Sequence, residues 1–149
     1  MNPVCEDIKD LLVGEGVGVF ASTKPNEWSI QVGDEPDSPS RTITIYDTPS
    51  TADKTFDSDR HFHHSSFQVR VRGKKYLSAH AKCEECRRTL DRYTTKVDGP
   101  KVALSFGDMR YDNITMDNEP LPLGQDSKGR FIFVVNGTAF RQRKESSEE

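Results

Sequence analysis

Two neighbouring segments with different hydrophobic periods constrain the fold of this 149-residue chain most strongly. Apolar and polar side chains alternate over residues 67–72, which is the period of a half-buried β-strand. After Gly73, residues 74–92 place their apolar side chains three and four positions apart, which predicts an α-helix with one buried face. The stripe on that face consists of Tyr76, Ala79, Cys83, Cys86, Leu90 and Tyr93. Together, the strand pattern and the helix pattern predict a fold in which helices pack on a sheet.

A further helix is predicted over residues 3–13, where Val4, Ile8, Leu11 and Leu12 form one stripe. Asn2 is placed to cap this helix, Pro3 suits its first position, and Gly14 and Gly16 end it. Alternating or apolar runs predict strands at 28–32, 42–46, 101–106, 111–116 and 131–135.

Two stretches are expected to be connections. Residues 47–66 show no periodicity, and residues 120–129 have turn chemistry at both ends. The predicted fold class is therefore α+β, with two layers. A mostly antiparallel or mixed sheet of four to six strands would carry two main helices on one face. We expect one domain over residues 1–140 and a charged, flexible tail over 141–149.

Composition argues against several classes of protein. The formal net charge is −3, whereas a duplex-DNA binder usually has a basic face. The longest apolar runs are too short to span a bilayer, and the N-terminus lacks the pattern of a signal peptide. Three cysteines fit reduced thiols better than a disulfide framework. We expect a soluble protein that is made in the cytoplasm and has no membrane partner.

The motif Cys83-Glu84-Glu85-Cys86 suggests zinc binding or thiol exchange at first sight. A structural zinc site needs four ligands, and no second ligand pair with suitable spacing follows. A redox motif would lie at the exposed start of a helix, whereas these cysteines lie in the middle of the apolar stripe. We therefore interpret both cysteines as core residues.

The most suggestive cluster for metal chemistry is His61, His63 and His64, with Asp57 and Asp59 nearby. Such residues can bind a divalent metal, and a small metal-dependent hydrolase using His61, His63, His64 and Asp59 is one alternative function. The cluster lies in a predicted irregular loop, whereas catalytic zinc sites fix their ligands on rigid elements. We favour a solvated or interfacial loop end, at which the histidines could make a pH-sensitive assembly contact.

No other pattern indicates catalysis or a cofactor. The chain has no nucleophile elbow and no zinc-protease motif, and its glycines at 14, 16 and 18 follow a helix rather than a strand. We therefore expect no catalytic, cofactor-binding or metal-binding residues. The basic residues Arg70, Arg72, Lys74, Lys75, Arg87, Arg88 and Arg92 are interleaved with acids, which is typical of a solvated face or a salt-bridged contact.

Three segments resemble a family of phage minor capsid proteins. One is residues 67–76, which lead into a helix ending Arg87-Arg88-Thr89-Leu90. Another is residues 43–48, after a loop that contains Glu35-Pro36. The third is residues 120–126, followed by Lys128-Gly129-Arg130 and the last strand.

The resemblance implies a tail terminator, or tail-completion, protein of long-tailed phages. Such proteins form a hexameric ring at the head-proximal end of the virion tail. The ring caps the tail tube, ends its polymerisation and provides the surface for head–tail joining. The implied partners are other copies of the chain, the tail tube protein and the head–tail connector or neck protein, with DNA at most passing through the lumen. A head-completion or neck protein is the alternative within this class.

A stop-ring needs two axial faces and a lateral face, which loops and strand edges can supply. The segments expected to make these contacts are residues 47–66, residues 107–129 and the N-terminal helix. The candidate interface residues are Asp57, Asp59, Arg60, His61, His63, His64, Arg70, Arg72, Tyr111, Leu121 and Leu123. The His-rich loop at 57–66 is the part that the resemblance does not match.

Overall fold

The computed structural model describes residues 2–49, 51–54, 61–93 and 104–143. Two helices and nine strands are found in these ranges, and all the strands belong to one sheet. The helices are α1 (Val4–Gly14) and α2 (Tyr76–Asp91). The strands are β1 (Val19–Phe20), β2 (Ser29–Val32), β3 (Thr42–Asp47), β4 (Thr51–Lys54), β5 (His61–Gly73), β6 (Leu104–Phe106), β7 (Met109–Met116), β8 (Leu121–Gln125) and β9 (Phe131–Arg143).

The sheet has the order β1-β2-β3-β5-β9-β7-β6, while β4 pairs with β5 and β8 pairs with β9. The pairs β1–β2 and β2–β3 are parallel and all the others are antiparallel. The predicted α+β class with a mixed sheet is confirmed, although the sheet has more strands than the four to six expected. The missed strands are short or lie at edges.

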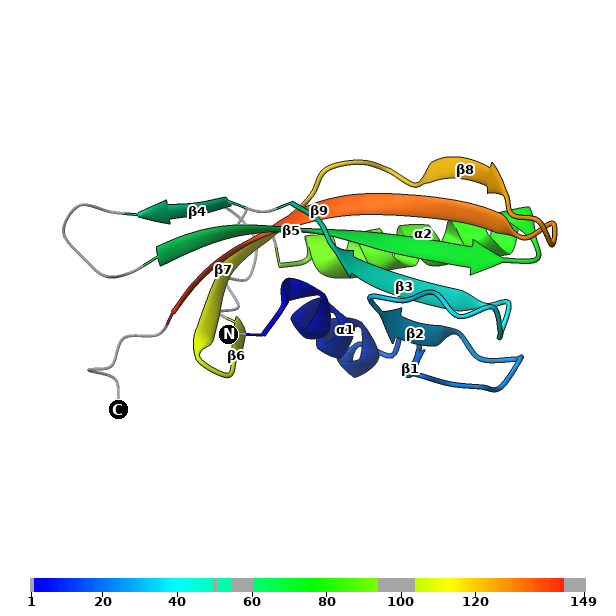
Figure 1. Cartoon of the computed structure of the whole chain (residues 1–149), viewed down its shortest axis with the longest axis horizontal. Coiled ribbons are helices and arrows are strands. Elements are labelled where there is room, and N and C mark those ends of the chain that lie inside the picture. Colours follow the sequence, from blue (N-terminus) through cyan, green and yellow to red (C-terminus); the bar gives the residue numbers. More distant parts are fainter. Residues whose placement is uncertain (1, 50, 55–60, 94–103, 144–149) are drawn as a thin grey trace.

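The antiparallel pair of β5 and β9 forms the centre of the molecule (Figure 1). Each strand has 13 residues, and their register runs from Phe62 opposite Gln142 to Gly73 opposite Phe131. Residues 131–135, which were predicted to form a strand, begin β9 of this pair. At about 3.3 Å per residue, such a ladder is roughly 40 Å long.

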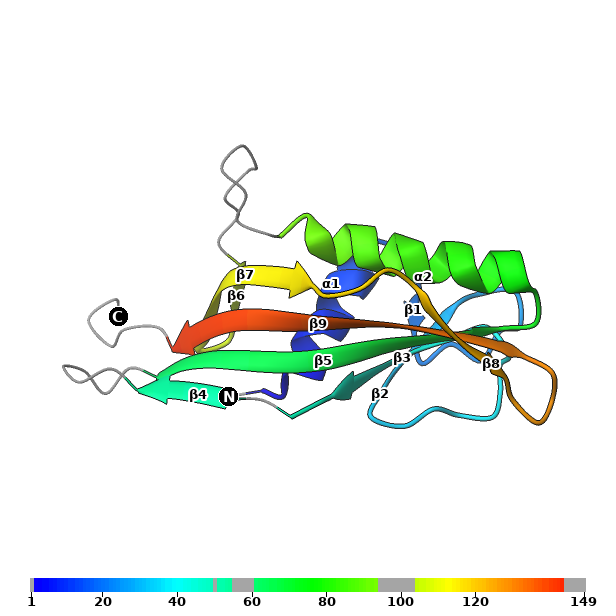
Figure 2. The same ribbon diagram turned by 90° about the horizontal axis from the view of Figure 1, so that it is seen from above.

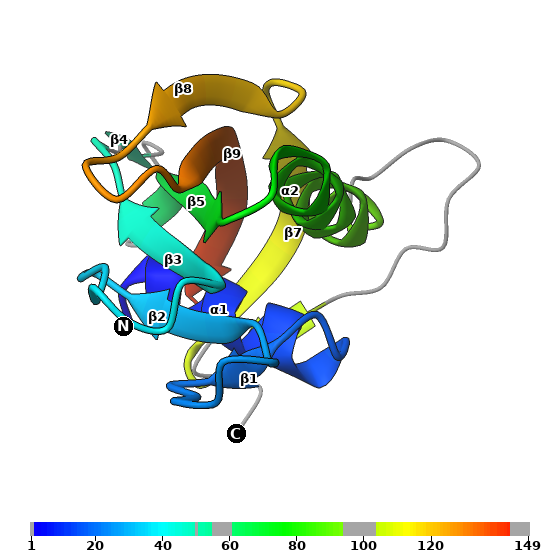
Figure 3. The same ribbon diagram turned by 90° about the vertical axis from the view of Figure 1, so that its right-hand side faces the viewer.

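Both helices lie on the same side of the curled sheet, as the end-on view shows (Figure 3). The predicted stripe of α2 is buried at Ala79, Cys83, Cys86 and Leu90, whereas Tyr76 is half-exposed. The α1 stripe packs against β2 and β3 with Ile8 and Leu12 fully buried. Burying a side chain of this size contributes about 1.5–3 kcal/mol.

The start of α1 differs from the expectation. Pro3, not Asn2, occupies the N-cap position, and it makes no side-chain capping bond. Instead, Asp47 at the end of β3 accepts a 2.9 Å hydrogen bond from the Cys5 amide. A carboxylate also suits the positive end of the helix dipole. The cap is thus supplied through tertiary structure.

Both expected connections contain strands in the structure. The described part of residues 47–66 contains β4 and the first half of β5, which lie side by side at the end of the ladder away from Gly73 (Figure 2). Residues 121–125 form β8. Residues 141–143, which were assigned to the tail, belong to β9, and Arg141 and Gln142 are buried there.

Candidate functional site

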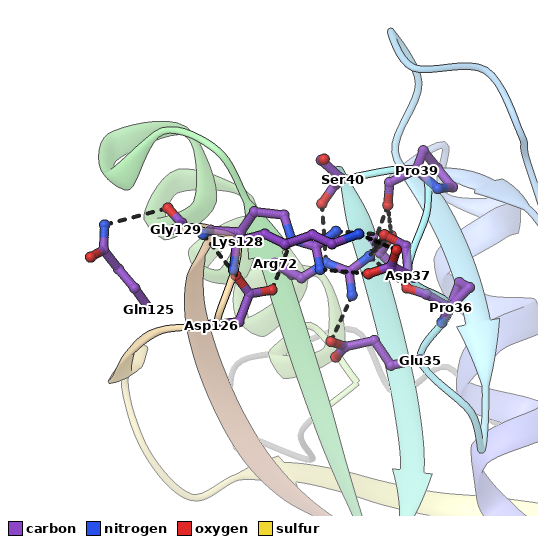
Figure 4. Close-up of polar contacts among 12 residues, drawn as sticks. Glu35, Pro36, Asp37, Pro39, Ser40, Arg72, Gln125, Asp126, Lys128 and Gly129 are labelled. Atoms are coloured by element: carbon purple, nitrogen blue, oxygen red, sulfur yellow. Dashed lines mark hydrogen bonds and ion pairs between the residues drawn. The ribbon is translucent and has the colours of Figure 1, made fainter.

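A buried ionic cluster at one end of the ladder joins three separate segments of the chain (Figure 4). Its centre is Arg72 of β5, whose side chain is 3% exposed. The Arg72 guanidinium donates to Oε1 of Glu35 at 2.8 Å and to the backbone oxygens of Pro36 at 2.6 Å and Pro39 at 2.9 Å. It therefore holds residues 35–39 in one conformation, which we call the pinned loop.

Arg130, the residue before β9, holds the pinned loop from the other side. Its Nη1 donates to the Asp37 carbonyl at 2.5 Å, and its Nε donates to Oδ2 of Asp126 at 2.8 Å. Lys128 also pairs with the Asp37 carboxylate. The turn between β8 and β9 is thereby joined to a loop about ninety residues earlier in the chain.

Electrostatics explains why these contacts fix the loop. A buried guanidinium is costly unless its donors are satisfied, and here carboxylates and backbone carbonyls satisfy them. Glu35 accepts from Arg72 and also lies 2.8 Å from Nε of Arg70. Bonds from the Arg130 and Lys128 amides, with the Arg130 side chain, hold the pKa of Asp126 below its usual value. Lys128 and Arg130 likewise lower the pKa of Asp37.

A second buried network joins α1 to the sheet. The Tyr111 hydroxyl donates to Oδ2 of Asp7 at 2.5 Å, and Arg141 donates to the Asn2 carbonyl at 2.8 Å and to the Ser65 hydroxyl at 2.9 Å. Burial raises the pKa of Asp7 above its usual value, although Tyr111 and Arg141 favour the ionised form. Burial also raises the pKa of Tyr111.

These two networks bury two residues that were expected to form an interface. Tyr111 is 1% exposed and Arg72 is 2% exposed, so both lie inside the subunit rather than on a contact surface. Arg70 is partly exposed, and Leu121 and Leu123 are about half exposed. Leu121 and Leu123 therefore remain available for contacts. Tyr111 lies in the core because the alternation of a β-strand places every second side chain there.

The histidines lie on a strand and not in an irregular loop. His61, His63 and His64 belong to β5, where they face residues 51–54 of β4. The His64 ring packs edge-on against Phe140, with centroids 4.7 Å apart. Asp57, Asp59 and Arg60 lie outside the described residues. Within the described ranges, no group of three or more His, Cys, Asp or Glu side chains is arranged to hold a metal ion.

Both cysteines of the CxxC motif are buried in the core, as predicted. Burial raises the pKa of Cys83 to about 12 and raises the pKa of Cys86 as well. Because the thiolate is the reactive form, this environment suits packing rather than thiol chemistry.

The basic residues do not form one open patch. Arg70 and Arg72 pair with Glu35, Arg87 and Arg88 pair with Glu84, and Arg92 pairs with Glu15. Sequence reasoning missed a different surface feature, the exposed apolar residues Val19, Phe20 and Leu77. Among the described residues, no helix is long and apolar enough to cross a bilayer.

The bacteriophage tail terminator protein family matches residues 11–141. The chain belongs to this family. The match includes the pinned loop, β5 and the turn before β9, so the segments that carry the resemblance meet in the ionic cluster.

Tail terminators are structural phage proteins, so the chain has a structural role in tail assembly and is a virion component. No curated protein matches the chain. Among solved structures, a chain from "Virion of native gene transfer agent (GTA) particle" aligns with a TM-score of 0.49 and 12% identity. The alignment covers 75% of this chain and 78% of that chain.

Proposed function

We propose that copies of this chain form a closed ring, expected to be a homohexamer, at the head-proximal end of the tail tube. The ring ends polymerisation of the tube and presents the surface that joins the head. Its partners are the tail tube protein on one side and the head–tail connector or neck protein on the other, and DNA passes through the lumen only transiently. Membership of the tail terminator family supports this role.

The observation that carries the proposal is the difference between the two ends of the β5–β9 ladder. One end carries the pinned loop and the turn before β9, which Arg72 and Arg130 join. The other end carries β4 and the histidine-bearing half of β5 (Figure 2). A stop-ring must bind two unlike partners on opposite axial faces, and a rigid ladder with unlike ends supplies both.

Rigidity at the pinned loop suits this role. A loop that must be ordered on binding costs roughly 0.5–1.5 kcal/mol for each immobilised side chain. The contacts of Arg72 and Arg130 order residues 35–39 before any partner arrives. Such a surface can bind a tube end without that cost.

Polymerisation of purified tail tube protein tests the proposal. Adding the chain should stop tube growth at substoichiometric amounts, and electron microscopy should show it at one end of each tube. Deleting residues 50–62 removes β4 and should leave a folded subunit that no longer stops growth. Unchanged tube length with the wild-type chain contradicts the proposal. A head-completion or neck protein would also leave tube length unchanged, but particles lacking it would carry normal, unattached tails.

A further inference from the structure

Two open edges of the sheet carry exposed apolar side chains that the contacts described above do not use. On β1, Val19 is 47% exposed and Phe20 is 52% exposed. On β8, Leu121 is 49% exposed and Leu123 is 50% exposed. In the described part of the chain, β1 pairs only with β2, and β8 pairs only with β9. We call these the β1 edge and the β8 edge.

The two edges lie on opposite sides of the sheet. Strands β2, β3, β5 and β9 separate them in the strand order. In the end-on view, β8 and β1 lie at opposite extremes of the curl (Figure 3). A subunit therefore presents two different apolar edges that face away from each other.

The surroundings of the two edges carry opposite charge. The β1 edge is bordered by α1, whose Lys9 ammonium lies 4.6 Å from the centre of the Phe20 ring. Around that lysine, α1 exposes the carboxylates of Glu6 and Asp10, whereas Glu15 at the C-cap pairs with Arg92 of the same subunit. With Asp7 buried and the Glu15–Arg92 pair neutral, this surface has a formal net charge of −1.

The β8 edge is bordered by α2, which is basic. Without Arg92, which pairs with Glu15, residues 74–91 contain five Lys or Arg side chains and three Asp or Glu side chains, a formal net charge of +2. One contact places the start of α2 beside this edge, because Tyr76 packs on Phe131, the residue opposite Gln125 of β8.

We infer that the β1 edge of one subunit docks on the β8 edge of the next copy of this chain. This inference rests on the proposed ring and assigns its lateral contact. Apolar side chains meet at the centre, while the acidic border of α1 faces the basic border of α2. A contact between two β1 edges would oppose like charges. Joining unlike edges is a head-to-tail contact, which closes into a ring when the rotation fits.

Single-edge variants test the contact. Phe20→Asp changes the β1 edge, and Leu123→Asp changes the β8 edge. Each should weaken self-association at least about tenfold, since burying an unpaired carboxylate costs more than 1.4 kcal/mol. Ser105→Asp is the matched control, because it adds the same charge to the exposed face of β6, another edge strand, and should assemble like wild type. Circular dichroism checks that all variants fold.

Mixing the two variants gives the sharper result. Each variant keeps one intact edge, so an equimolar mixture should form 1:1 dimers, whereas each variant alone stays monomeric. Native mass spectrometry measures this over a range of concentrations and again with isolated tail tubes. Any of three results would overturn the inference. The variants could assemble like wild type, their mixture could stay monomeric, or the wild-type chain could fail to self-associate. If the variants still form rings that stop tubes, only the edge assignment fails. If wild type assembles through these edges without stopping tubes, only the proposed function fails.

Discussion

Nη1 of Arg72 lies 2.8 Å from Oε1 of Glu35, and the arginine side chain is only 3% exposed. The two residues are 37 positions apart. Arg72 belongs to β5, which forms the longest antiparallel pair of the sheet with β9, and Glu35 belongs to the pinned loop. Their contact turns a surface loop into a fixed part of the subunit. Stability and the shape of this axial end are therefore coupled.

Replacing Arg72 should test that coupling. Arg72→Met removes the charge and leaves Glu35 and several loop carbonyls without their donor. We expect the free energy of unfolding to fall by about 3–5 kcal/mol, as for other broken buried ion pairs. Urea denaturation measures the loss. The control Arg88→Met removes an arginine whose side chain is 75% exposed, and a similar loss in both variants would contradict the assignment.

Gly137 should not tolerate a side chain. A Cβ at this position of β9 would lie 2.6 Å from Cζ of Phe67 and 2.8 Å from Sδ of Met116. Gly137→Ala should therefore lower the free energy of unfolding by roughly 1–3 kcal/mol through overpacking. Gly14→Ala is the control, since a Cβ there meets no atom within 4 Å and alanine favours the helix. Equal stability of the two variants would show that the core around Phe67 is looser than described.

The three cysteines should react slowly in the folded protein. All are buried, and burial raises the pKa of Cys5 and of Cys83 to about 12 each. The reactive thiolate is therefore scarce at neutral pH. Ellman's reagent should modify the three thiols only after guanidinium unfolds the chain. Rapid modification of Cys83 or Cys86 in the native protein would reopen a redox or metal role for the motif.

Asp126 should make stability depend on pH. Its folded pKa is lowered from 3.8, so its contribution is fully present above that value and is lost as pH falls through the folded pKa. Wild type should therefore be more resistant to urea than Asp126→Asn at pH 6, and the difference should narrow below pH 3.8. A gap that stays constant down to pH 2 would mean that the carboxylate charge is not what holds the turn.

The central elements could be predicted because their patterns reflect burial on one side. Alternation over residues 67–72 indicated the second half of β5, and the spacing of three and four residues after Gly73 indicated α2. Both segments pack one face on the core, which produces a clear period. The buried cysteines followed from the same reasoning.

Other elements left no such signal. Every residue of β8 is exposed, so no apolar alternation marks it as a strand. Residues 61–64, three of which are histidines, form a strand through pairing with β4 and β9 and not through an apolar period. The ionic cluster could not be predicted from the sequence either, because the order of strands in the sheet is what brings Arg72, Asp37 and Arg130 together.

The most direct test of the account is the length of tails in particles made without this chain. Negative-stain electron microscopy should show overlong tails of broad length distribution when the chain is missing, and tails of one length when wild-type protein is supplied. Tails of normal, uniform length in its absence would contradict a role in ending tube growth.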